Sequence, residues 1–86
     1  MASYSVWLVP SARKELRRLP PHELARIHQK IVQLATNPRP VGVDKLTGST
    51  DHYRLRQGDY RIVYHLDDSS HHVTILRIRH RREAYR

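Results

Sequence analysis

The last third of the chain, from Asp51 to Arg86, is dominated by short runs that are typical of β-strands. Three of them, His52 to Gln57, Tyr60 to Asp67 and His71 to Arg79, show alternation or are rich in β-branched and aromatic residues, and Gly, Asp or Ser separates them. This pattern predicts a three-stranded antiparallel meander, which restricts the chain to folds built around a sheet.

Arginine, and not glutamate or threonine, occupies many of the polar positions of this meander. The arginines are Arg54, Arg56, Arg61, Arg77 and Arg79, followed by Arg81, Arg82 and Arg86. A sheet face with so many cations and no acidic partners repels itself and loses stability. We therefore interpret it as a surface for an external anion, with phosphate as the first candidate.

Composition limits the possible partners. The 86 residues predict a single domain, residues 1–86, whose core is too small to bury a cofactor as well, so no cofactor is expected. With 16 Lys and Arg against 8 Asp and Glu, nucleic acid, an acidic protein or an anionic membrane would fit the charge. A membrane is the weakest candidate because no apolar run approaches the roughly 20 residues of a spanning helix. We expect a cytoplasmic protein.

The absence of cysteine fits a cytoplasmic protein and excludes disulfides, thiolate zinc sites and cysteine nucleophiles. Catalysis would have to use Arg, Lys, His, Tyr or carboxylates. His71 and His72 fall in a predicted hairpin turn without companions at metal-ligand spacing, so no metal site is predicted.

The first half of the chain predicts one strand and two helices. Tyr4 to Val9 suits a strand at an edge or beside the final strand, and Ser11 is a natural N-cap for a helix over Ala12 to Leu19. A second helix is expected from Pro21 to Thr36, because apolar residues recur at helical spacing and proline suits a first turn.

A loop from Asn37 to Thr50, with a brief extended piece around Lys45 and Leu46, connects the helices to the meander. The predicted order is therefore β-α-α-β-β-β, an α+β domain. Two helices would cover one face of an antiparallel sheet and leave the other face available for a ligand.

Three segments carry a resemblance to a known family. They are KLTG at 45–48, HYRLRQGDYRIVYHLDD at 52–68 and IRHRREAYR at 78–86. With the order of elements, they resemble the RelE/ParE superfamily of bacterial toxin–antitoxin toxins, and most of all its RelE branch. The resemblance runs over nearly the whole chain.

The resemblance implies a function and partners. RelE members are ribosome-dependent endoribonucleases that cut mRNA in the decoding (A) site, and each is neutralised by a small antitoxin. The expected partners are thus a cognate antitoxin, ribosomal RNA and mRNA, with operator DNA bound only as a toxin–antitoxin complex. ParE relatives share the fold but inhibit DNA gyrase, so fold alone does not decide the function.

RNA cleavage of this kind uses the neighbouring 2′-hydroxyl as nucleophile and leaves 2′,3′-cyclic phosphate and 5′-hydroxyl ends. The site needs cations for the phosphorane and groups that move two protons. Carried over by position, the resemblance implies catalytic roles for Arg61, Arg81 and Tyr85 and RNA contacts for Arg54 and Arg56. Tyr85 would stack on a base, orient the 2′-hydroxyl or accept its proton. Lys45, Arg77 and Arg79 complete the predicted RNA-binding set.

Some family members carry lysines where this chain has Arg54 and Arg56. Lysine with a lowered pKa can transfer a proton, whereas arginine is a poor acid or base. Proton transfer would then fall to Tyr85, Arg81 or a histidine, of which His80 is the first choice because imidazole titrates near neutrality.

Two rival functions stay open from the sequence, as does the role of one basic helix. The leading rival to an endoribonuclease is a gyrase-inhibiting toxin, a binding protein without chemistry. The second is a basic nucleic-acid-binding module without catalysis. The basic helix from Ser11 to Arg18 would either contact ribosomal RNA, pair with an acidic antitoxin segment, or form an ordinary solvated surface.

Overall fold

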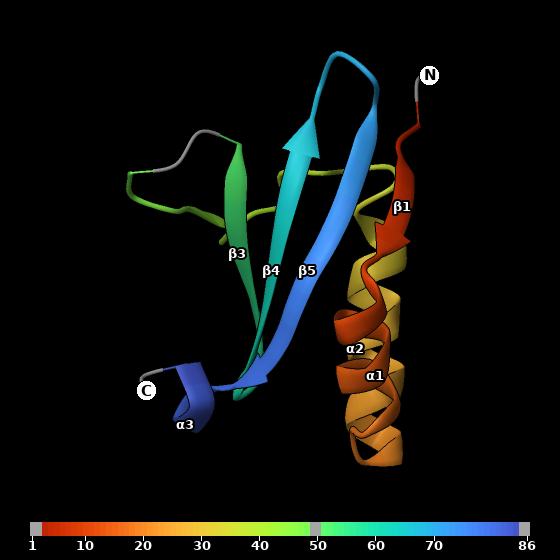
Figure 1. Ribbon diagram of the computed structural model, residues 1–86, viewed down its shortest axis with the longest axis vertical. Helices are drawn as coiled ribbons and strands as arrows, with labels where there is room; N and C mark the ends of the chain where they lie inside the picture. Colours follow the sequence, from red (N-terminus) through yellow and green to blue (C-terminus); the bar gives the residue numbers. More distant parts are fainter. Residues whose placement is uncertain (1–2, 49–50, 85–86) are drawn as a thin grey trace.

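A computed structural model describes residues 3–48 and 51–84, with side chains up to Arg82 apart from the same gap. Its elements follow the predicted order, with a two-residue strand and a terminal helical turn added (Figure 1). They are β1 (Ser5–Leu8), α1 (Pro10–Arg17), α2 (Pro21–Gln33), β2 (Asp44–Lys45), β3 (His52–Gln57), β4 (Tyr60–Asp67), β5 (His72–His80) and α3 (Arg81–Ala84).

The five strands form one sheet in the order β1-β5-β4-β3-β2. The meander β3-β4-β5 is antiparallel as predicted, but β1 runs parallel to β5, with Ser5 opposite His72 and Leu8 opposite Ile75. The predicted α+β architecture is confirmed, and the sheet is mixed instead of wholly antiparallel. The predicted position of the first strand, at an edge or beside the final strand, is confirmed. Alternation within a strand contains no information about the direction of its neighbour, which is why the parallel direction was not predicted.

Prolines define where both helices begin. Helix α1 starts at Pro10, with Val9 as N-cap and no side-chain cap, so the predicted capping role of Ser11 is wrong. The fixed φ of proline suits the first helical turn and forces the preceding residue into an extended conformation, as Val9 shows with φ −61° and ψ 155°. Helix α2 starts at Pro21 as predicted and ends at Gln33, after which tight turns continue to Thr36.

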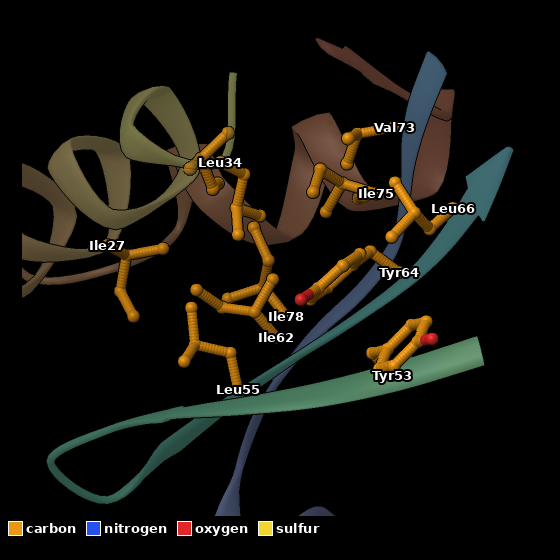
Figure 2. Close-up of a cluster of buried hydrophobic side chains, with 12 residues drawn as sticks. Ile27, Leu34, Tyr53, Leu55, Ile62, Tyr64, Leu66, Val73, Ile75 and Ile78 are labelled. Atoms are coloured by element: carbon orange, nitrogen blue, oxygen red, sulfur yellow. The ribbon is translucent and has the colours of Figure 1, made fainter. Parts of the chain in front are cut away.

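The core lies between the two helices and one face of the sheet. Figure 2 shows Ile27 of α2 and Leu34, the C-cap of that helix, above Leu55, Ile62, Tyr64 and Ile78 of the strands. Alternate residues of β3 and β4, such as Arg54 and Arg56, therefore point away from the helices. We call the sheet side away from α1 and α2 the open face.

A β-bulge in β5 decides which arginines reach the open face. Val63 lies opposite Arg77, whereas the next residue of β4, Tyr64, lies opposite Ile75, so Leu76 is an extra residue in β5. With an unbroken period of two, Arg77 and Arg79 would share the core face with Ile75. The bulge reverses this alternation, so Ile78 joins the core and both arginines lie on the open face.

Among the described residues, neither α1 nor α2 has the length and apolar character needed to cross a bilayer.

Candidate functional site

A row of three arginines crosses the open face of the sheet. Arg56 of β3 lies opposite Arg61 of β4, which lies opposite Arg79 of β5. The neighbouring row, Leu55, Ile62 and Ile78, is buried in the core. Because residues paired across strands point to the same face, the register places these arginines together, as the predicted site requires.

The hairpin between β3 and β4 and the first residue of α3 enclose a cavity beside this row. The cavity measures about 350 Å³ and is lined by Arg56, Gly58, Asp59, Arg61 and Arg81. We call it the arginine cavity. It brings together Arg61 and Arg81, which were predicted to be catalytic, with Arg56, which was predicted to bind phosphate.

The hairpin turn holds Arg81 at the arginine cavity. Gly58 adopts a φ of +60°, which side-chain-bearing residues rarely take, so the chain reverses within two residues. The carbonyl oxygen of Asp59 accepts a hydrogen bond of 2.7 Å from the backbone N–H of Arg81. Its carboxylate lies 3.8 Å from the Arg81 guanidinium. The sequence reasoning missed Asp59, although its place in the turn between two arginine strands was a usable signal.

Arg61 is the member of the cavity with the least solvent exposure. Its relative exposure is 7%, and among the described residues it is the charged residue that is buried. A buried guanidinium stays charged and attracts anions more strongly than one in bulk water, because less solvent screens it. The cavity therefore combines a fixed buried cation with two exposed ones, Arg56 and Arg81.

The next row along the open face contains Arg54, Val63 and Arg77. A guanidinium nitrogen of Arg54 lies 3.5 Å from an Asp44 carboxylate oxygen, and Arg77 is exposed. Lys45 is an exposed residue of β2, opposite Tyr53 of β3. Arg54 and Arg77 therefore flank the arginine cavity, and Arg54 is partly neutralised. Lys45 shares the helix side of the sheet with Tyr53, so the structure does not bring it to the cavity.

Arg79 is turned toward the edge of β5. Its Nε donates to Glu15 Oε2 at 3.0 Å, and Glu15 Oε1 accepts the backbone N–H of Ile78 at 2.8 Å. Strand β1 pairs with β5 only as far as Ile75, so Glu15 of α1 satisfies the strand edge beyond β1. Of the predicted RNA contacts, Arg79 is the one held by a charged hydrogen bond from α1.

His80 lies apart from the arginine cavity. It is opposite Tyr60, in the row beyond Arg61 and Arg79, and alternation turns it toward the helix side of the sheet. The rings of His80 and Tyr60 meet edge to face at 5.2 Å, and His80 Nδ1 accepts the backbone N–H of Arg82 at 3.2 Å. Both residues line a different cavity of about 860 Å³. Tyr85 lies outside the described residues.

The opposite end of the sheet has a charged network that was not predicted. Arg39 donates to both carboxylate oxygens of Asp68, at 3.2 and 2.6 Å, and to the Tyr53 hydroxyl at 3.1 Å. Tyr4 donates to the same carboxylate at 2.6 Å. The hydrogen bonds from Arg39 and then Tyr4 lower the pKa of Asp68 to about 2.

A buried tyrosine anchors this network to the core. Tyr64 has no solvent exposure, stacks on Tyr53 at 5.7 Å and donates to the Pro38 carbonyl at 2.6 Å. Burial raises the pKa of Tyr64 to about 12, because it disfavours the phenolate. The network thus connects the residue before β1, strand β3, the β4–β5 turn and the loop after α2.

Comparison with known proteins gives a consistent set of matches. A family model described as the ParE toxin of the type II toxin–antitoxin system, parDE, matches residues 6–85. Toxin RelG of Mycobacterium tuberculosis is 34% identical over 84 residues, which cover 96% of this chain and 97% of the relative. Toxin RelE of the same organism is 33% identical over 84 residues, covering 96% and 87%.

Solved structures agree with these relatives. The toxin–antitoxin complex RelBE2 of Mycobacterium tuberculosis matches with a TM-score of 0.80 and 32% identity, over 91% of this chain and 98% of the other. The archaeal RelE–RelB complex of Pyrococcus horikoshii matches with a TM-score of 0.83 and 31% identity, over 92% and 96%. The isolated RelE toxin of E. coli matches with a TM-score of 0.80 and 25% identity, over 96% of each chain.

Proposed function

The chain belongs to the ParE toxin family of type II toxin–antitoxin systems, and within it we propose a RelE-type endoribonuclease that cuts mRNA in the ribosomal A site and so inhibits translation. The observation that carries this proposal is the arginine cavity. Three guanidinium groups line it, and the lining includes one carboxylate, Asp59. This arrangement suits a phosphodiester whose negative charge increases during reaction.

The proposed reaction is a transesterification within the RNA. The 2′-oxygen attacks the adjacent phosphorus and loses its proton, while the bond from phosphorus to the 5′-oxygen breaks and that oxygen takes up a proton. The products are a 2′,3′-cyclic phosphate and a 5′-hydroxyl. Arg61 and Arg81 donate hydrogen bonds to the phosphorane oxygens, and Arg56 and Arg54 hold the flanking phosphates.

Of the three candidates for proton transfer, Tyr85, Arg81 and His80, we assign the step to Tyr85. The geometry argues against His80, because its ring lies on the helix side of the sheet. We expect His80→Ala to retain cleavage within about threefold, since a general acid or base contributes roughly 10²-fold or more. A larger loss in a folded variant would restore the role predicted for His80.

Primer extension on mRNA in purified translating ribosomes tests the proposal. The wild-type protein should cut within the A-site codon and leave free RNA intact, and an Arg61→Ala, Arg81→Ala double variant should not cut. The matched control is an Arg26→Ala, Lys30→Ala double variant, which removes two cations from α2. Equal loss in both variants would refute the assignment of the cavity.

A second candidate function follows from the name of the matching family model. As a ParE toxin, the protein would inhibit DNA gyrase by binding alone. Absence of cuts by a folded, antitoxin-free protein, together with inhibition of gyrase supercoiling, would favour this candidate. The Arg61→Ala, Arg81→Ala double variant should then inhibit gyrase as strongly as the wild type.

The proposed partners are the ribosome, mRNA and a cognate antitoxin, with operator DNA contacted only by the toxin–antitoxin complex. The matching structures from Mycobacterium tuberculosis and Pyrococcus horikoshii are complexes of a toxin with its antitoxin. Co-expression with the protein encoded by the neighbouring gene, followed by size-exclusion chromatography, would test antitoxin binding.

A further inference from the structure

A second row of side chains crosses the open face at the far end from the arginine cavity. His52 of β3 lies opposite His65 of β4, His65 lies opposite Thr74 of β5, and Thr74 lies opposite Trp7 of β1. The adjacent row contains Tyr53, Tyr64 and Ile75, which are buried in the core. We call Trp7, His52 and His65 the ring row.

The three rings are held in place by neighbours. The rings of His52 and His65 lie 5.0 Å apart at an angle of 58°. The Arg13 guanidinium lies 5.4 Å from the Trp7 ring, and its Nε donates to the Leu8 carbonyl at 2.9 Å. Trp7 nevertheless keeps 42% of its surface exposed. A large aromatic ring on an open sheet, fixed by a cation on one side, is a ready stacking surface.

The ring row is continuous with the arginines. On β3, His52 and Arg56 share the open face and are separated by four residues, or about 14 Å of strand. His65 and Arg61 have the same separation on β4. Arg54 and Arg77 occupy the row between them. A chain of phosphates that leaves the arginine cavity along the strands would therefore meet two more cations before reaching the rings.

Charge identifies the class of ligand. Strands β3, β4 and β5 place five arginines on the open face, which they share with two aspartates, Asp67 of β4 and Asp44 of β2. Asp67 accepts hydrogen bonds from Ser69 and Ser70 in its own turn. Cations along a groove, followed by ring side chains, are the combination that binds single-stranded nucleic acid: phosphates contact the cations and bases stack on the rings.

We propose that the ring row is a second RNA subsite, which stacks the bases of nucleotides on one side of the cleaved phosphate. This inference rests on the proposed endoribonuclease function and assigns Trp7, His52 and His65 a role in substrate binding. The rings act on affinity for RNA, and the arginine cavity acts on the chemistry.

The single tryptophan of the chain makes the subsite directly measurable. A 2′-O-methyl single-stranded RNA, which lacks the nucleophile, should quench Trp7 fluorescence in a saturable manner in the antitoxin-free protein. A His52→Ala, His65→Ala double variant should bind roughly 5- to 100-fold more weakly, because stacking contributes about 1–3 kcal/mol per base. The matched control is a His22→Ala, His28→Ala double variant, which removes two exposed histidines from α2.

An abasic oligonucleotide with the same backbone separates stacking from phosphate contact. It should bind through the arginines without quenching Trp7, and the ring-row substitutions should not change its affinity. Equal quenching by abasic RNA, unchanged affinity in the ring-row variant, or quenching by an acidic peptide but not by RNA would each overturn the proposal.

The ribosome assay distinguishes failure of the subsite from failure of the proposed function. If the wild type cuts mRNA and the ring-row variant cuts with unchanged kcat/KM and unchanged RNA affinity, the subsite is wrong and the function stands. If the wild type does not cut, the function fails. Base-dependent quenching of Trp7 would in that case still establish the subsite, because it is measured without ribosomes.

Discussion

The two ends of the sheet treat arginine in opposite ways. At the end formed by the β4–β5 turn, Arg39 is held by both oxygens of Asp68 and by the Tyr53 hydroxyl. At the other end, Arg56, Arg61 and Arg81 surround a cavity with Asp59 as its carboxylate, 3.8 Å from Arg81. At the network end, Arg39 is neutralised by Asp68 in a contact that connects separate elements. At the arginine cavity, positive charge remains in excess, and this is where we place the phosphate.

The largest expected difference between the two ends is in activity. Arg61→Ala should lower the rate of mRNA cleavage on the ribosome about 100-fold or more, because it removes donors from the developing phosphorane charge. Arg39→Ala should leave that rate within a few-fold and lower the melting temperature instead. Single-turnover cleavage and thermal unfolding of both variants make the comparison. Similar activity losses would erase the proposed distinction.

Removing one buried hydroxyl should weaken the network end. Tyr64→Phe deletes the donor to the Pro38 carbonyl, so the free energy of unfolding should fall by about 1–3 kcal/mol. Tyr53→Phe is the matched control and should have a smaller effect, since the Tyr53 hydroxyl accepts from the exposed Arg39. Urea unfolding measures both. A Tyr53→Phe loss as large as that of Tyr64→Phe would contradict the dominance of burial.

Glu15 of α1 holds Arg79 at the edge of β5, in the row of arginines beside the arginine cavity. Glu15→Gln leaves one acceptor for two donors, which should reduce stability by about 1 kcal/mol and release Arg79. With Arg79 available to RNA, the slope of log affinity against log salt should steepen by about 0.7, the value for one more phosphate contact on a single strand. Glu23→Gln on α2 is the control and should leave the slope unchanged.

The smallest expected effect is acid sensitivity of the network. The Asp68 pKa is about 2 in the folded protein, below its unfolded value of 3.8. The stability it contributes is therefore complete above pH of about 4 and is lost as the pH falls from 3.8 toward 2. Arg39→Ala removes the main cause of this shift. Between about pH 5 and about pH 2.5, the urea midpoint should therefore fall less in Arg39→Ala than in the wild type. An equal fall in both proteins would contradict the assignment of this acid sensitivity to Asp68 and Arg39.

Local pattern was sufficient for much of the fold and for part of the candidate site. The bounds predicted for β3 and β4 are confirmed, because alternation there is unbroken. Arg56 and Arg61 were predicted to share a face, and the register pairs them. The resemblance added Arg81, which the structure brings to the same cavity.

What local pattern missed depends on contacts distant in sequence. The bulge at Leu76 cannot be inferred from β5 alone. Pairing with β4 and packing in the core together place Ile75 and Ile78 on one face. Arg39 and Asp68 are 29 residues apart, so neither had a visible partner. His80 was chosen for its imidazole, but it lies opposite Tyr60 and one position after Arg79 in β5, so alternation turns it away from the open face.

The parallel pairing of β1 with β5 has a consequence for biosynthesis. Strand β5 lies between β1 and β4, and its first residue, His72, lies opposite Ser5. During translation, β1 and α1 have no sheet to pack on until β5 has been made, and the arginine cavity also waits for Arg81. On the proposed function, the cleavage site is therefore completed only after β5 and Arg81 have been made, and the long-range strand pairing that delays folding also delays activity.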